Sequence, residues 1–275
     1  MKIESLFVLE GIGSASGLIY ENNQLSIVCD NANYLYQYSM HDNHLSRIPL
    51  ANAEVMEAIP KHLKLDLESV VRFEHMLYIF GSGSTVNRNF MFEIDLENQN
   101  VIEHNLDYFY DRLKDFAEIS NCDFNIEGTI LIEGTWYFFQ RGNAGTGKNG
   151  VFRITGNLMD DNYSIDFTEM KLPRIEDVTT SFTDAVWVND GIYFLATAER
   201  TLSAYDDGHI LGTLVGQIDP TTMQVFNTKL ISNLHKFEGL TLFKQTSDHI
   251  EFLLCEDNDS DEPNSVIYKL SLSKG

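Results

Sequence analysis

A repeat that closes on itself is the feature of this sequence that most constrains its fold. Five short motifs, ASGLIY, LESVV, IEGTIL, TDAVWV and FEGLTLF, each precede a strongly apolar run. The second residues of these motifs are Ser16, Glu68, Glu127, Asp184 and Glu238. They follow one another at intervals of 52, 59, 57 and 54 residues, and the count from the last through the end of the chain back round to the first is 53. A period of this length predicts a ring of repeated structural units.

Each unit has room for four short strands. Runs rich in β-branched and aromatic residues alternate with turns rich in Gly, Asn and Asp, and the third unit reads TILIE, TWYFF, GVFRIT and YSIDFTEMKL. Four such strands form the antiparallel meander of one β-propeller blade. The sequence therefore predicts an all-β protein, a five-bladed β-propeller of four-stranded blades, with residues 1–275 as a single domain.

The last unit supplies three strands, GLTLF, IEFLLC and SVIYKLSL, before the chain ends. The segment Ile3 to Leu9 precedes the first motif and belongs to no other unit, so we expect it to complete the last blade and to protect its edge. Two helices are expected between blades. The first covers Tyr108 to Ile119, with Asp107 as its cap, and a weaker one covers Ala53 to Ile59, before Pro60.

Composition limits the partners and the location. With 19 basic and 41 acidic residues the formal charge is −22, which would repel a nucleic acid backbone. No apolar run reaches the 18 or so residues of a membrane span, and no standard signal peptide is seen. Three cysteines cannot form a disulfide framework, and this usage favours a reducing compartment, the cytoplasm.

The inner strand of every blade lines the central shaft, so the five repeat residues should form a ring. The simpler interpretation is that they begin strands and cap turns. Yet two carboxylates about 5 Å apart at an effective dielectric constant of about 20 repel each other by roughly 3 kcal/mol. Protonation, Arg or Lys partners, or a metal must relieve this repulsion. Oxygen ligands without His or Cys favour calcium, then magnesium, over zinc or iron. The predicted metal ligands are Ser16, Glu68, Glu127, Asp184 and Glu238.

Basic residues are expected where the shaft opens. Turns after the second strands should emerge beside the starts of the inner strands, and they carry Arg88, Arg141 and Lys148. Such side chains above a cation would suit an anionic group such as phosphate or carboxylate. The alternative is that the arginines neutralise the acidic ring or are ordinary loop residues.

The ring and its closure resemble the calcium-activated nucleotidases of the apyrase type. Those five-bladed propellers hold one calcium in the shaft through a Ser or Glu from the start of each blade. LESVV, IEGTIL and FEGLTLF are similar to their Glu-bearing blade starts, ASGLIY and FTDAVW stand where they carry serine, and FFQRGNAGTGKNGVF is similar to their Arg-containing loop. The same motifs are similar to phytase-like esterase and lactonase propellers and to an uncharacterised bacterial propeller family.

The favoured hypothesis is a calcium-dependent hydrolase of a small anionic ester, a phosphate or phosphoanhydride. The cation would polarise the substrate and acidify a bound water, Arg88 and Arg141 would neutralise developing charge, and Glu127 would accept the proton. One alternative is a non-catalytic propeller with a structural ring, whose face binds a protein or a small ligand. Another is a glycosidase, because such shafts also host carboxylate pairs.

Overall fold

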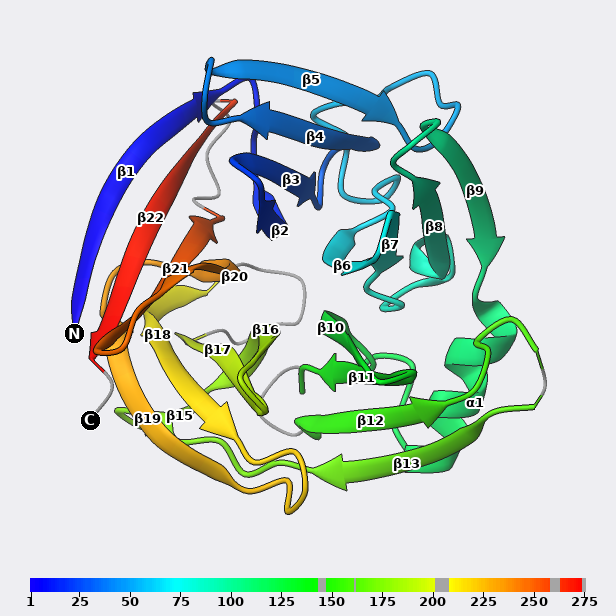
Figure 1. Ribbon diagram of the computed structural model, residues 1–275. Helices are drawn as coiled ribbons and strands as arrows, with labels where there is room; N and C mark the ends of the chain where they lie inside the picture. Colours follow the sequence, from blue (N-terminus) through cyan, green and yellow to red (C-terminus); the bar gives the residue numbers. More distant parts are fainter. Residues whose placement is uncertain (143–146, 161, 201–207, 258–262, 274–275) are drawn as a thin grey trace.

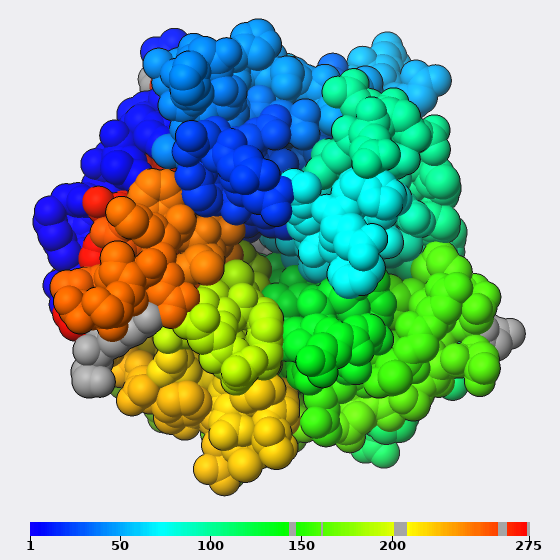
Figure 2. Space-filling model, viewed as in Figure 1, coloured from blue at the N-terminus to red at the C-terminus, as the bar shows by residue number. Residues whose placement is uncertain are grey.

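Five four-stranded antiparallel sheets surround a central axis, as Figure 1 shows. The computed structural model describes residues 1–142, 147–160, 162–200, 208–257 and 263–273. In the first four blades the strands pair in chain order from the axis outward, and in the last blade the outermost strand comes from the N-terminal segment. The predicted all-β class and five-bladed architecture are confirmed. The inner strands face one another around the axis, and Figure 2 shows the blades packed closely about the centre of one face.

The first two blades and the helical connection come from residues 15–117. Blade 1 contains β2 (Ala15–Glu21), β3 (Gln24–Cys29), β4 (Tyr34–Ser39) and β5 (His44–Pro49). Blade 2 contains β6 (Leu67–Phe73), β7 (Met76–Gly81), β8 (Phe90–Asp95) and β9 (Asn100–Asn105), with a short 3-10 turn at Val86–Arg88. Helix α1 (Asp107–Ala117) follows β9 and lies beside the outer strands of the next blade (Figure 1).

The third and fourth blades are joined by a small hairpin. Blade 3 contains β10 (Ile126–Ile132), β11 (Thr135–Gln140), β12 (Gly150–Thr155) and β13 (Ser164–Glu169). The hairpin consists of β14 (Arg174–Ile175) and β15 (Val178–Thr179). Blade 4 contains β16 (Ser181–Val188), β17 (Gly191–Arg200), β18 (His209–Ile218) and β19 (Val225–Ser232).

The last blade joins the two ends of the propeller, as the sequence predicts. It contains β20 (Phe237–Gln245), β21 (His249–Glu256) and β22 (Asn264–Ser273), and its outer strand is β1 (Lys2–Glu10). The two outer strands run antiparallel, with Lys2 opposite Ser271 and Glu10 opposite Asn264. The ladder satisfies backbone groups along β22 that would otherwise form an open edge.

The core lies between neighbouring blades, because successive side chains of a strand point to opposite faces of its sheet. On β11, Phe138 packs edge-on against Phe80 of blade 2 with ring centroids 5.1 Å apart. The next residue, Phe139, packs against Phe182 of blade 4 at 5.3 Å. This alternation explains the continuous apolar runs of the middle strands, which are covered on both faces.

The two helix predictions have different outcomes. Helix α1 forms, but its cap residue is Leu106, while Asp107 is already helical and its carboxylate accepts a hydrogen bond from Asn89 Nδ2 at 2.7 Å. The helix predicted at residues 53–59 is absent. Instead the backbone of this segment pairs with a loop of blade 1, where Asn33 N donates to Met56 O at 2.9 Å. Among the described residues no helix has the length and apolar character needed to cross a membrane.

Candidate functional site

The same irregularity begins the inner strand of all five blades. Pairing with the second strand skips one residue, as between Ile126 and Gly128 in blade 3. A β-bulge of this kind leaves one residue unpaired and re-aims its side chain. The five residues at this position, here called the axial ring, are Ser16, Glu68, Glu127, Thr183 and Glu238.

The residue after the ring position is glycine in three blades, because neighbouring inner strands approach closely there. A Cβ on Gly17 would lie 2.9 Å from Glu68 O in the next blade, and one on Gly128 would lie 3.1 Å from Asp184 Cα. Contacts this short would force backbone to move. The motif therefore combines a polar residue aimed by a bulge with a small residue that lets the blades meet.

The register corrects the sequence alignment in blade 4. Asp184 pairs with Leu195 and occupies the glycine position, so Thr183 is the residue equivalent to the four others. The Asp184 carboxylate instead accepts hydrogen bonds from the backbone N–H groups of Ala185 and Leu240, both at 2.7 Å. Burial raises the pKa of Asp184, and these two donors oppose that rise. Its role in the structure is to join blades 4 and 5.

Arg141 is the first of two buried cations at the ring. Its Nη1 lies 3.3 Å from Glu127 Oε1 and its Nη2 lies 3.2 Å from Glu199 Oε2. Asn125 Nδ2 also donates to Glu127 Oε1, at 2.6 Å. Burial raises the pKa of Glu127, whereas Arg141 and Lys236 work against this rise.

Lys236 is the second cation, and it lies outside the basic residues predicted from the turns. Its Nζ lies 2.7 Å from Glu238 Oε1, 3.4 Å from Glu199 Oε1 and 3.5 Å from Asp257 Oδ2. Burial alone would raise the pKa of Glu199, but Arg141 and Lys236 together hold it below its ordinary value. Glu199 is thus an ionised carboxylate shared by the two cations.

Glu68 differs from the other ring glutamates. No described residue forms a hydrogen bond or an ion pair with its carboxylate, and Glu68 is half-buried. Burial raises the pKa of Glu68 well above its ordinary value, and repulsion from Glu127 and Asp66 adds to this. Glu68 is therefore the ring carboxylate with the greatest need for a counterion.

Ser16 and its neighbour Asp30 form the blade 1 side of the site. The Ser16 hydroxyl accepts a hydrogen bond from Asp30 N at 3.1 Å and donates to Ser14 O at 3.3 Å. Asp30 Oδ2 pairs with Lys64 Nζ at 2.5 Å, while its Oδ1 is buried without a hydrogen-bond partner. Burial raises the pKa of Asp30 to about 6, although Lys64 opposes the rise.

The other predicted mouth residues lie in different surroundings. Arg88 Nη1 pairs with Asp66 Oδ2 at 2.6 Å and donates to Ser84 Oγ at 2.8 Å, so its charge is already neutralised. Lys148 was expected at the mouth, but its Nζ donates to Ala117 O at the end of α1, at 2.9 Å. Residues 143–146 of the predicted Arg-containing loop lie outside the described residues.

The donor chemistry of the axial ring fits a hard cation. Two hydroxyls and three carboxylates are the oxygen ligands that calcium prefers. Within the described ranges, however, no three acidic, His or Cys side chains converge on one point at metal-binding distance. Arg141 and Lys236 hold the carboxylates of Glu127 and Glu238, so these two groups would have to exchange partners for the ring to enclose an ion.

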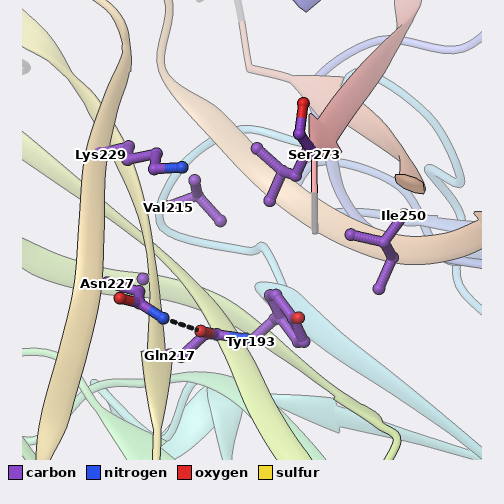
Figure 3. A pocket seen from close by; sticks show the side chains of 9 residues that line it. Tyr193, Val215, Gln217, Asn227, Lys229, Ile250 and Ser273 are labelled. Atoms are coloured by element: carbon purple, nitrogen blue, oxygen red, sulfur yellow. Dashed lines mark hydrogen bonds between the residues drawn. The ribbon is translucent and has the colours of Figure 1, made fainter. Parts of the chain in front are cut away.

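A separate cavity of about 320 Å³ lies between blades 4 and 5. Its lining includes Tyr193, Gln217, Asn227, Lys229 and Ile250, and Asn227 Nδ2 donates to Gln217 Oε1 at 2.8 Å (Figure 3). Among the described residues, no axial ring residue and no acidic side chain lines it. The cavity is therefore distinct from the shaft.

The fold and the polar shaft define the chain as a five-bladed β-propeller with an acidic axial ring. Residues 11–272 match the family described as "Family of unknown function (DUF6929)", and the chain belongs to that family. No curated protein matches the sequence.

Solved structures with the same fold include several enzymes. A glutaminyl cyclase from Myxococcus xanthus superimposes with a TM-score of 0.51 and 11% identity, over 99% of this chain and 97% of the other. A luciferin-regenerating enzyme gives 0.50 and 8%, over 100% and 97%. The GH43 protein BlXynB from Bacillus licheniformis gives 0.55 and 9%, over 97% of this chain and 54% of the other. At such identities the likeness shows the fold alone.

Proposed function

We propose that the shaft binds calcium through the axial ring and hydrolyses a small anionic ester, a phosphate or phosphoanhydride. The observation that carries this proposal is the repetition of the bulge. In every blade the re-aimed position holds a side chain with an oxygen atom, either a hydroxyl or a carboxylate. The resemblance to calcium-activated nucleotidases supports the same ligand set, with Thr183 in place of a serine.

Charge balance also favours a bound cation. Asp30 and Asp66 are each matched by one cation, Lys64 and Arg88. Glu127, Glu199 and Glu238 share the two cations Arg141 and Lys236, and Glu68 forms no ion pair with a described residue. With all four carboxylates ionised, two formal negative charges are left, and a divalent ion would offset both while giving Glu68 a partner.

The chain's own residues would bind the substrate and move a proton. Bound calcium would supply positive charge that polarises the ester and acidifies a water. Glu127 would accept the proton, and the contacts of its carboxylate with Asn125 and Arg141 would keep it oriented. Arg141 would meet the negative charge that develops on the ester. Arg88 would be a second neutralising group, although Asp66 already pairs with its guanidinium.

Calorimetric titration with calcium, together with melting in EDTA and in calcium, tests the ion site. We expect one ion to bind per chain and to raise the melting temperature. Glu68→Gln should weaken binding at least tenfold, whereas Glu103→Gln, on the exposed outer strand of blade 2, should bind as the wild type does. Equal affinities for the two variants would overturn the ion site.

A calcium-dependent assay tests hydrolysis. Nucleotides, phosphate monoesters, lactones and aryl glycosides would be compared with calcium and with EDTA, and with Glu127→Gln. We expect turnover of a phosphate or phosphoanhydride that needs both calcium and Glu127. Calcium binding without turnover of any substrate would favour the non-catalytic alternative. The glycosidase alternative has less support, because Trp136 is packed between Phe80 and Phe138 and offers no platform for a sugar.

A further inference from the structure

Two buried cations from different blades meet on one carboxylate. Arg141 follows β11 of blade 3, Lys236 precedes β20 of blade 5, and both contact Glu199, which lies near the end of β17 in blade 4. Arg141 Nη2 lies 3.2 Å from Glu199 Oε2, and Lys236 Nζ lies 3.4 Å from Glu199 Oε1. Glu199 thus bridges two positive groups that would otherwise repel each other.

Each cation contacts both this bridge and the axial ring, and Lys236 also contacts Asp257 at 3.5 Å. Arg141 uses Nη2 for Glu199 and Nη1 for Glu127, at 3.3 Å. The shortest contact of Lys236 is with Glu238, at 2.7 Å. If both ring carboxylates were otherwise engaged, each cation would gain a free donor and yet stay in place through Glu199. A guanidinium and an ammonium so held are the groups that proteins use to bind phosphate oxygens.

We infer that Arg141 and Lys236 form a site for a phosphate-class anion, masked by Glu127 and Glu238 and opened when those carboxylates bind a cation instead. This inference rests on the proposed function for the cation that opens the site. Glu199 acts as a positioning residue for both groups. The carboxylates of Glu127 and Glu238 explain the masking, because they occupy the two cations and their negative charges would repel a bare phosphate.

Replacing the two masking carboxylates tests the inference without calcium. Glu127→Gln with Glu238→Gln lowers the negative charge by two, as a divalent ion would. Methylphosphonate binding would be measured by calorimetry in EDTA. We expect the double variant to bind at least tenfold more tightly than the wild type. Adding Lys236→Met should abolish this gain, whereas adding Lys269→Met, a matched change at the ion pair with Glu4 in the outer part of blade 5, should keep it.

The outcomes separate this inference from the proposed function. A folded double variant that binds no better than the wild type overturns the anion site, even if the wild type binds calcium. Binding by the double variant together with a wild type that takes up no calcium supports the anion site and overturns the calcium site. Glu238→Gln alone, which unmasks only Lys236, provides the same comparison if the double variant does not fold. Wild type with calcium should also bind methylphosphonate at least tenfold more tightly than in EDTA.

Discussion

The carboxylate of Glu199 in blade 4 lies 3.2 Å from the guanidinium of Arg141 in blade 3, and both side chains are largely buried. Loss of this negative charge leaves Arg141 and Lys236 facing each other. We expect Glu199→Gln to lower the free energy of unfolding by about 3 kcal/mol, the cost of breaking a buried ion pair. Urea denaturation measures this, with Glu103→Gln as the exposed control. A loss no larger than the control's would contradict the bridging role.

Glu68 should make the protein less stable as the pH rises. Its pKa is raised in the folded protein, so the folded state holds a proton that the unfolded state has already released. Stability therefore falls from the ordinary pKa of a glutamate up to the raised one. In EDTA, Glu68→Gln should melt several degrees above the wild type at pH 8 and at the same temperature near pH 4. If the difference in melting temperature between the two proteins does not change from pH 4 to pH 8, the carboxylate is not held in its acid form.

Substitutions at Thr183 and Asp184 test which of the two residues binds calcium. The strand register favours Thr183, and the alignment of the motifs favours Asp184. Thr183→Val removes the ring hydroxyl and should weaken calcium binding several-fold. Asp184→Asn should leave calcium affinity unchanged but lower the melting temperature, because one oxygen that accepts a backbone N–H from Ala185 or Leu240 is replaced by a donor. Calorimetry and thermal melting measure both effects. A loss of calcium affinity in Asp184→Asn alone would restore Asp184 as the ligand.

Substitutions of Leu9 and Val8 test whether β1 closes the last blade. They are neighbours on β1, but Leu9 is 2% exposed and Val8 is 53% exposed. Leu9→Ala should cost about 2–4 kcal/mol of unfolding free energy through lost burial and a cavity. Val8→Ala should cost less than about 0.5 kcal/mol, as surface changes usually do. Urea unfolding of the two variants gives the comparison, and similar losses would mean that β1 does not seal the core.

The architecture could be predicted because a blade is a local structure. Its four strands are consecutive in sequence, so strand patterns and turns define it, and a fixed period then defines the ring. Even the strand supplied by the N-terminal segment followed from the three strands left in the last unit. The helix predicted at residues 53–59 is wrong because the backbone of this segment pairs with a loop that contains Asn33. Helix periodicity in the sequence does not reveal such a partner.

The site was harder to predict because a bulge shifts register by one residue. In blade 4 the motif TDAVWV offers both Thr183 and Asp184. Resemblance to the other acidic motifs favours Asp184, whereas the bulge leaves Thr183 unpaired. Lys236 belongs to a second set of polar residues that the register reveals. The residue two positions before each axial ring residue is polar in all five blades, namely Ser14, Asp66, Asn125, Ser181 and Lys236. In blade 4 this pattern appears only when Thr183, and not Asp184, is taken as the ring residue.

The pairing of β1 with β22 sets the order in which the molecule can be completed. During translation β1 is made before every other strand of the propeller, and its partner is made after all of them. The earliest strand must therefore wait, unpaired, for the latest one, and closure has the long sequence separation that slows folding. A ribosome that stalls late would release a chain with most of its blades but an open circle. The glutamates of the shaft would then lack the enclosure that brings them together.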